Sequence, residues 1–204
     1  KDEHELALML RAAVEHNGPV AIRYPRGKGE GIVNYYAEQT RENGSFTGLD
    51  SDNKIVQKTK EIEIGKAELL RDGKDILILA SGRTVQEAVK AIKKLEQENK
   101  NISVALINAR FIKPLDSEMI LDWAGKVDKI ITVEEHVLNG GFGSAVLELL
   151  ADSGIFESGR KYTIKRVGIR DKFVEHGSQN ILRAEYKVDA DAIFESVVQM
   201  AALK

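Results

Sequence analysis

Hydrophobic and polar positions change their period several times along the chain, and each period predicts a different element. Near the N-terminus, apolar residues recur three and four positions apart, which predicts an amphipathic helix from about Asp2 to His16. The apolar face of this helix consists of Leu6, Met9, Leu10, Ala13 and Val14. The next segment, Pro19 to Tyr24, has the composition of a strand. One helix and one strand cannot form a core alone, so this part of the chain needs a partner surface.

From residue 62 onward, short apolar runs alternate regularly with helical patterns. Strands are expected at about 62–70 as an edge strand, and at 75–80, 102–107, 129–133 and 162–167. Helices are expected from Thr84, after Asp116, and at 143–151, 178–185 and 189–203. Strand-helix-strand units of this length form right-handed parallel crossovers. The pattern therefore predicts a three-layer α/β domain with a mostly parallel sheet.

Several residues match the signals that begin helices. Thr84 and Glu87 have the spacing of a capping box, in which each side chain bonds to the backbone of the other residue. Single N-cap residues are expected at Asp116, Ser144, Ser178 and Asp189.

The stretch 32–61 is polar and aperiodic, which predicts a linker. It exceeds the roughly 12 to 15 residues that are usual for a connection without regular structure. The predicted organisation is thus residues 1–31, a linker at 32–61, and an α/β domain at 62–204. Because the chain begins at Lys1 inside a helical pattern, we expect residues 1–31 to be the end of a domain that begins upstream.

Composition narrows the possible classes of function. The 204 residues carry a formal net charge of −2 and include no cysteine, so disulfides, thiol catalysis and cysteine-ligated metals are excluded. No long basic run suggests a nucleic acid or a membrane surface as a partner. The apolar runs are too short to span a bilayer, and the N-terminus lacks a signal-peptide pattern. We expect a cytoplasmic protein.

The most suggestive chemistry lies in the sequence Arg23-Tyr24-Pro25-Arg26-Gly27. Pro25 cannot donate to a sheet ladder, and nearby glycines let the backbone approach a ligand closely. A guanidinium offers a rigid fork of donors that matches phosphate or carboxylate. The residues alone admit two interpretations, an anion clamp at the end of a strand or a surface turn with solvated charges.

Two further motifs have structural interpretations that compete with functional ones. The glycine turn, residues 140–143, could hold an anion at the start of a helix, but it lacks the dinucleotide fingerprint, and tight packing explains it better. Glu134 and His136 could converge from one face of a strand, yet two potential ligands do not define a metal site. A surface cluster at the strand end is the preferred interpretation.

Two loops also contain candidate residues. Asp171, Glu175 and His176 suggest a catalytic triad, but no nucleophile elbow accompanies them. Arg110 and Lys113 follow a strand at its carboxyl end, where open α/β sheets bind ligands. An ion pair or an interface contact is an equally good explanation for them.

Taken together and in order, these motifs resemble the 1-deoxy-D-xylulose-5-phosphate synthase family of transketolase-type enzymes, over nearly the whole chain. The Pro-Leu-Asp and Glu-Glu segments would admit any transketolase-type protein, and the Arg-Tyr-Pro-Arg-Gly motif selects the family. The matching segments are 23–27, 64–66, 109–116, 132–135, 140–146 and 173–177. The stretch 32–61 is longer than the connection expected in that family.

The resemblance implies a homodimeric enzyme that uses thiamine diphosphate and magnesium to join pyruvate to glyceraldehyde 3-phosphate with loss of carbon dioxide. It implies that residues 1–31 are the end of the pyrimidine-binding domain and that Arg26 contacts the phosphate of the aldehyde, whereas Arg23 is structural. Upstream domains would bind the cofactor and the metal, so this chain alone would be inactive. Alternatives are a transketolase, a 2-oxo acid dehydrogenase β subunit, and an α/β interaction module without chemistry.

Overall fold

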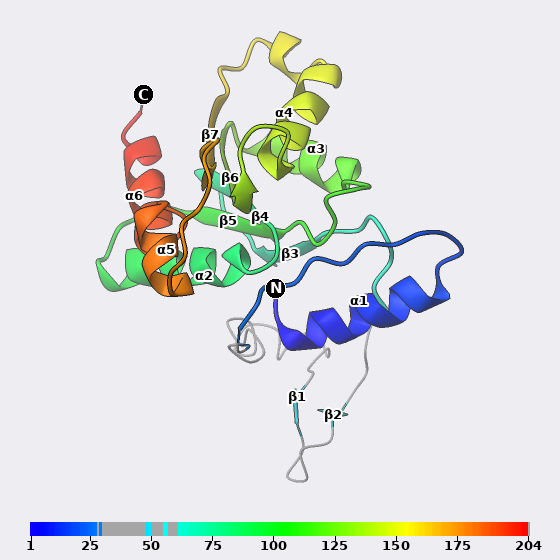
Figure 1. The fold of residues 1–204 in the computed structure, drawn as a ribbon. Coiled ribbons are helices and arrows are strands. Elements are labelled where there is room, and N and C mark those ends of the chain that lie inside the picture. The colour runs from blue at the N-terminus through cyan, green and yellow to red at the C-terminus, as the bar shows by residue number, and fades with distance from the viewer. Residues whose placement is uncertain (28, 30–47, 50–54, 57–60, 204) are drawn as a thin grey trace. The chain divides into compact units, whose positions relative to one another are not determined.

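The computed structural model describes residues 1–27, 29, 48–49, 55–56 and 61–203 (Figure 1). The chain divides into two compact units. We call them the N-terminal unit, from Asp2 to Ile64, and the sheet unit, from Gly65 to Lys204 together with Lys1.

In the N-terminal unit, α1 runs from Glu3 to Glu15, as the apolar spacing predicts. Asp2 caps this helix by accepting a hydrogen bond from the backbone N–H of Glu5 at 2.8 Å. The prediction of a strand at Pro19 to Tyr24 is wrong, because residues 19–25 pair with no strand in the part of the chain that the structure describes. Strand-forming composition does not make a strand when no neighbouring strand satisfies its backbone.

Two short strands, β1 (Gly48–Leu49) and β2 (Ile55–Val56), form an antiparallel pair in the same unit. The sequence pattern does not predict this pair. It lies within the stretch 32–61 that we interpreted as a linker, and most of that stretch is outside the described residues.

The sheet unit contains five strands in the order β3-β5-β4-β6-β7. Strands β4, β5, β6 and β7 are parallel, and β3 is an antiparallel edge strand. This arrangement confirms the predicted mostly parallel sheet. The bounds are β3 (Glu68–Arg71), β4 (Ile76–Ala80), β5 (Val104–Asn108), β6 (Lys129–Val137) and β7 (Thr163–Ile169).

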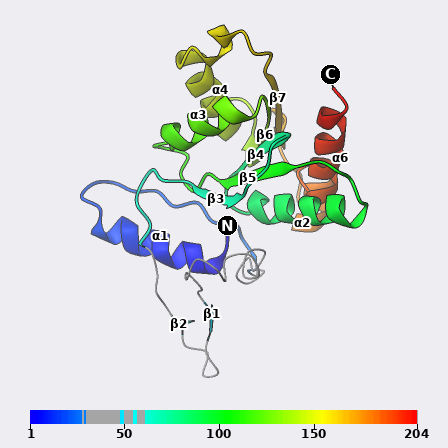
Figure 2. The same cartoon turned by 180° about the vertical axis from the view of Figure 1, so that it is seen from behind.

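Helices cover both faces of this sheet and complete the three layers that the sequence predicts (Figures 1 and 2). Helices α2 and α6 pack against each other on one face, while α3 and α4 lie on the other. No helix of the described residues is long and apolar enough to cross a membrane. The bounds are α2 (Thr84–Gln97), α3 (Ser117–Lys126), α4 (Phe142–Asp152), a 3-10 turn η3 (Ile155–Ser158), α5 (Gln179–Glu185) and α6 (Ala190–Ala201).

Both faces of the central strands contribute to the core. Leu77 and Leu79 of β4 belong to the cluster that packs against α3 and α4, and the intervening Ile78 is equally inaccessible. Every residue of β4 and β5 is buried, which explains why both strands read as continuous apolar runs.

The capping predictions have mixed outcomes. Asp116 and Asp189 are N-caps, as predicted, and accept hydrogen bonds from Met119 at 3.1 Å and Ala192 at 3.0 Å. The capping box at Thr84 is wrong, because the Thr84 hydroxyl donates to the carbonyls of Ser81 and Val133. Those contacts join the start of α2 to the end of β4 and to the middle of β6.

Candidate functional site

The Arg-Tyr-Pro-Arg-Gly stretch is the candidate site with the clearest chemistry, and it lies at the surface of the N-terminal unit. Residues 23–27 are all exposed, and Tyr24 is 68% exposed. Gly27 has a φ of 133°, a backbone conformation that residues with a side chain rarely adopt. Glycine is therefore the residue best suited to this position after Arg26. The stretch thus presents Arg26 between a proline with fixed φ and a glycine with positive φ. Its role as an anion clamp remains a prediction.

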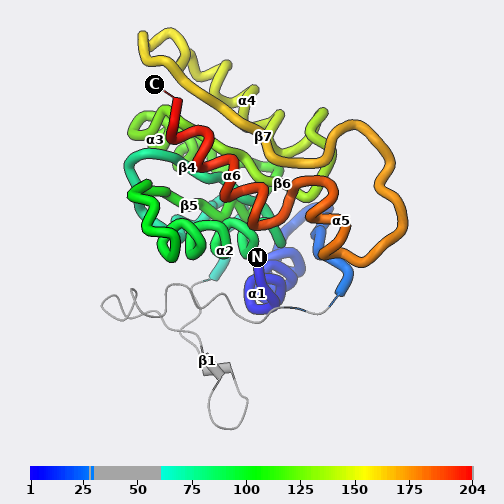
Figure 3. The backbone as a smooth tube through the Cα atoms, turned by 90° about the vertical axis from the view of Figure 1, so that its left-hand side faces the viewer, coloured from blue at the N-terminus to red at the C-terminus, as the bar shows by residue number. Residues whose placement is uncertain are grey.

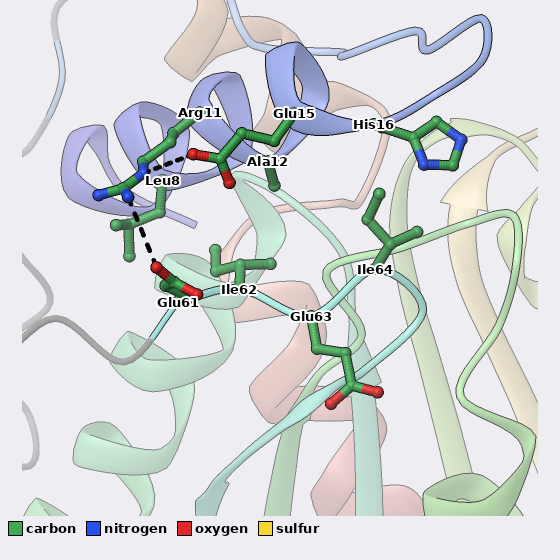
Figure 4. A pocket seen from close by; sticks show the side chains of 9 residues that line it. All are labelled: Leu8, Arg11, Ala12, Glu15, His16, Glu61, Ile62, Glu63 and Ile64. Atoms are coloured by element: carbon green, nitrogen blue, oxygen red, sulfur yellow. Dashed lines mark hydrogen bonds and ion pairs between the residues drawn. The ribbon is translucent and has the colours of Figure 1, made fainter.

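A hollow of about 360 Å³ lies elsewhere in the N-terminal unit, between α1 and residues 61–64 (Figure 4). Arg11 lines this hollow, and its guanidinium lies 3.0 Å from Glu15 and 3.5 Å from Glu61. Both carboxylates raise the pKa of Arg11. The hollow therefore has more acidic than basic groups and is unsuited to a phosphate or carboxylate. Its lining residues are Leu8, Arg11, Ala12, Glu15, His16, Glu61, Ile62, Glu63 and Ile64.

In the sheet unit, the glycine turn before α4 holds an anion that belongs to the protein itself. The Glu134 carboxylate accepts hydrogen bonds from the backbone N–H groups of Phe142 at 2.7 Å and Gly143 at 2.8 Å. A side chain on Gly143 would lie 2.5 Å from Thr132 Oγ1 and 3.1 Å from Glu134 Oε1. The packing interpretation of the glycines is therefore correct. These N–H groups are not available to an outside ligand.

The interpretation of Glu134 and His136 as a surface cluster is wrong for the first residue. Glu134 is 1% exposed, and this burial raises the pKa of its carboxyl group, while the two backbone donors act in the opposite direction. His136 is exposed, and its Nδ1 lies 3.1 Å from the carbonyl oxygen of Val137. A register irregularity between Val133 and Val137 interrupts the simple alternation of the strand at these two residues.

Ser144 is not the N-cap that we predicted, since Gly141 occupies that position and Ser144 lies inside α4. Its hydroxyl donates to the Leu138 carbonyl at 2.7 Å and accepts from Arg166 at 2.9 Å. Arg166 also donates to Leu138 at 2.8 Å. These bonds fix the turn between β6 and α4. Ser178 has the predicted N-cap position before α5 but makes no side-chain capping bond.

Glu135, next to Glu134 along β6, joins a different helix. Its Oε1 lies 2.6 Å from Nε of Arg183, the one buried residue of α5. The neighbouring glutamates thus bond to α4 and to α5, as alternation along a strand allows. The sequence does not reveal Arg183 as the partner of Glu135, because the two residues are 48 positions apart.

The carboxyl end of β5 has an ion pair, which is one of the two alternatives for Arg110. The guanidinium of Arg110 lies 3.0 Å from Glu68, and Asn108 also donates to Glu68 at 3.2 Å. Arg110 has a φ of 55°, in the left-handed region. Lys113 is exposed and precedes Pro114 in a cis peptide bond.

The loop that suggests a triad is exposed throughout. Asp171, Glu175 and His176 all lie on the surface. Among the residues that the structure describes, no group of three His, Cys, Asp or Glu side chains could hold a metal ion.

Comparison with known families resolves the fold assignment. Residues 65–193 match the family described as Transketolase, C-terminal domain. The chain belongs to this family. The matched range corresponds to nearly all of the sheet unit, and the mostly parallel five-stranded sheet is that of a transketolase C-terminal domain.

Two curated relatives resemble the chain over almost its entire length. It is 46% identical over 204 residues to 1-deoxy-D-xylulose-5-phosphate synthase 1 of Geobacter sulfurreducens, covering 100% of this chain and 28% of the relative. It is 42% identical over 201 residues to 1-deoxy-D-xylulose-5-phosphate synthase of Heliobacterium modesticaldum, covering 98% of this chain and 27% of the relative. The chain therefore spans little more than a quarter of each synthase.

Among solved structures, this transketolase C-terminal domain resembles a split-gene transketolase described as an inactive beta4 tetramer. The TM-score is 0.61 and the identity is 30%, with 71% of this chain and 45% of the other covered. This likeness supports the family assignment from the arrangement of the backbone.

Proposed function

We propose that the chain is the C-terminal part of a 1-deoxy-D-xylulose-5-phosphate synthase. The whole enzyme would be a thiamine-diphosphate-dependent transferase of the cytoplasm that joins pyruvate to glyceraldehyde 3-phosphate with loss of carbon dioxide. The observation that carries this proposal is the 46% identity over all 204 residues. That match includes residues 1–64, which precede the family domain, so it is more specific than membership of the domain family.

Within this proposal, Arg26 contacts the phosphate of the aldehyde substrate. Its guanidinium is on an exposed segment, between Pro25 and Gly27. A guanidinium suits a phosphate, because its planar fork of donors can form two parallel hydrogen bonds with the phosphate oxygens.

The cofactor of the whole enzyme would lie in domains upstream of this chain. Among the described residues, no group of three His, Cys, Asp or Glu side chains is placed to hold a metal ion. The helix N-terminus after the glycine turn, which could otherwise hold a diphosphate, is filled by Glu134.

For the chain by itself, we propose a structural role and association with a second copy. The split-gene transketolase that resembles it is described as a tetramer of one kind of subunit, and as inactive. Helix α1 exposes Leu10 and Val14, which are 51% and 87% exposed. Sequence from the upstream domain would cover these side chains.

A chimeric enzyme tests the proposed function directly. This chain replaces the matched 28% of the Geobacter sulfurreducens synthase 1, and formation of 1-deoxy-D-xylulose 5-phosphate from the two substrates is measured. We expect activity from the chimera and none from this chain alone or from the truncated synthase alone. A folded chimera of the correct mass that makes no product, beside an active parent enzyme, would refute the proposal.

A further inference from the structure

Strand β7 forms one edge of the sheet in the sheet unit. It ends the strand order and has a single neighbour, β6, among the strands that the structure describes. Figure 3 shows β7 running between α6 and α4. With seven residues, β7 is longer than β3, the four-residue strand at the opposite edge. An edge strand carries a row of backbone donors and acceptors that can pair with a further strand.

The hydrogen bonds to β6 determine which backbone groups of β7 point outward. The N–H of Thr163 donates to the carbonyl of Asp128 at 2.9 Å, and the carbonyl of Ile169 accepts from the N–H of Leu138 at 2.8 Å. Backbone groups of successive residues in a strand point to alternate sides, so the odd-numbered residues of β7 face β6. The N–H and C=O groups of residues 164, 166 and 168 therefore point away from the sheet. A row of this kind matches the backbone of another extended segment.

The two faces beside this edge differ in polarity. On the α4 face, Ile164 and Tyr162 pack against the buried cluster but are only partly buried themselves. The Phe156 ring is 43% exposed and meets the Tyr162 ring edge-on, with 5.6 Å between the centroids. On the α6 face, the ammonium group of Lys165 lies 3.0 Å from Oε1 of Gln199. Alternate side chains of an added strand would thus meet apolar rings on one face and a lysine on the other.

The charges near the edge select the chemistry of such a strand. Residues 155–172 contain six basic and two acidic side chains. The basic residues are Arg160, Lys161, Lys165, Arg166, Arg170 and Lys172, and the acidic residues are Glu157 and Asp171. A strand with carboxylates is attracted to this surface, whereas a strand with lysines is repelled. A nucleic acid also carries negative charge, but its backbone cannot continue the alternation of N–H and C=O groups.

We propose that the outer edge of β7 binds an acidic, extended peptide segment of a partner protein, which adds a sixth strand to the sheet. The backbone of this segment pairs with residues 164, 166 and 168. Its apolar side chains contact Phe156 and Tyr162, and its carboxylates face Lys165. This inference concerns a partner of the chain and does not depend on the proposed function.

Amide hydrogen exchange, followed by NMR on the full 204-residue chain, tests the edge directly. The probe is a blocked seven-residue peptide that alternates valine and glutamate and matches the length of β7. In the free chain, we expect fast exchange at Ile164, Arg166 and Gly168 and slow exchange at Lys165 and Val167, which face β6. Saturating peptide should slow exchange at the three outward amides at least about tenfold, because each of them gains an acceptor.

Two further peptides separate strand addition from simple attraction of charge. The same sequence with every backbone nitrogen methylated keeps the carboxylates but has no N–H donors. A peptide of alternating valine and lysine keeps the donors but reverses the charge. Titration calorimetry should give dissociation constants at least about tenfold higher for both than for the acidic peptide. Equal affinity of the methylated peptide would refute pairing of the backbones, and equal affinity of the lysine peptide would refute an acidic partner.

A charge reversal on the protein gives an independent test. Lys165→Glu should raise the dissociation constant of the acidic peptide about threefold to tenfold. Lys100→Glu is the matched control, because it changes the net charge equally while Lys100 is an exposed residue after α2. We expect no change for this control, and equal losses in the two variants would contradict binding at the edge. Far-UV circular dichroism checks that both variants are folded.

The exchange rates of the free chain can also overturn the proposal. Slow exchange at residues 164, 166 and 168 that disappears on dilution would show that a second copy covers the edge. Slow exchange at every concentration would show that the chain covers its own edge, and failure of the acidic peptide to bind would refute the proposed partner. None of these measurements uses a substrate, so an inactive chimera would refute the synthase assignment without affecting their outcome.

Discussion

Nε of Arg183 lies 2.6 Å from Oε1 of Glu135, and this ion pair joins α5 to β6. The Arg183 side chain is 7% exposed and that of Glu135 is 31% exposed. Because α5 has seven residues and buries only Arg183, its position depends on this polar contact more than on apolar packing. The Glu-Glu sequence of β6 is thus a structural element that fixes two helices.

Removing the carboxylate of this pair should be costly, because the guanidinium of Arg183 then remains buried without an opposite charge. For Glu135→Ala we expect a loss of about 1 to 3 kcal/mol in the free energy of unfolding. Asp122→Ala is the matched control, since Asp122 pairs with Lys126 at the same distance of 2.6 Å, but both side chains are more than half exposed. That loss should be about 0.5 kcal/mol or less. Urea unfolding, followed by the fluorescence of Trp123, the single tryptophan, measures both losses in stability. Equal losses for the two variants would contradict the importance of burial.

Two helical glycines should respond in opposite ways to the addition of a methyl group. In Gly143→Ala the new Cβ would lie 2.5 Å from Thr132 Oγ1, so we expect a loss of about 1 to 3 kcal/mol in the free energy of unfolding. In Gly125→Ala of α3 nothing lies within 4 Å of the new atom, and alanine favours a helix. The free energy of unfolding should increase by about 0.4 to 1 kcal/mol there. A Gly143→Ala protein as stable as the wild type would show that the turn can relax.

The sequence predicts most of the sheet unit because its signals are local. The apolar run of β4 and the spacing of α2 are repeated patterns, and Asp116 and Asp189 cap helices that begin immediately after them. The order of the strands could not be predicted, since periodicity shows that a strand exists but not which strand lies beside it. The strand expected at Pro19 to Tyr24 fails for the same reason.

The candidate site shows where local signals are insufficient. Glu134 looks like a surface residue, because a carboxylate is rarely buried without partners. Its partners are backbone N–H groups, which no side-chain pattern reveals. Thr84 and Glu87 have the correct spacing for a capping box, but the Thr84 hydroxyl donates instead to the nearby Ser81 carbonyl and to the distant Val133 carbonyl.

The raised pKa of Glu134 predicts a pH dependence of stability. Burial raises this pKa above its ordinary value of 4.5, so the folded state holds the proton more strongly than the unfolded state. The resulting contribution to stability is complete below about pH 4.5 and is lost as the pH rises through the folded-state pKa. Glutamine does not titrate. From about pH 4 to pH 7, the free energy of unfolding of the wild type should therefore fall relative to that of Glu134→Gln.

Urea unfolding of both proteins across this pH range provides the measurement. Glu134→Gln should also be less stable at every pH, since an amide can accept from only one of the two backbone donors through its oxygen. If the difference between the two proteins does not change with pH, the pKa of Glu134 is not raised in the folded state.

Arg26 should affect one substrate of the proposed enzyme far more than the other. In the chimera, Arg26→Ala removes a charged hydrogen bond to the phosphate, worth roughly 1.5 to 3 kcal/mol. We expect the apparent KM for glyceraldehyde 3-phosphate to rise about tenfold or more while that for pyruvate, which has no phosphate, changes little. Arg26→Lys keeps the charge but loses the bidentate fork, so its effect should be intermediate. Steady-state kinetics with each substrate varied in turn measures both KM values. Equal increases for the two substrates would exclude a phosphate contact, because a general disturbance of the active site does not distinguish one substrate from the other.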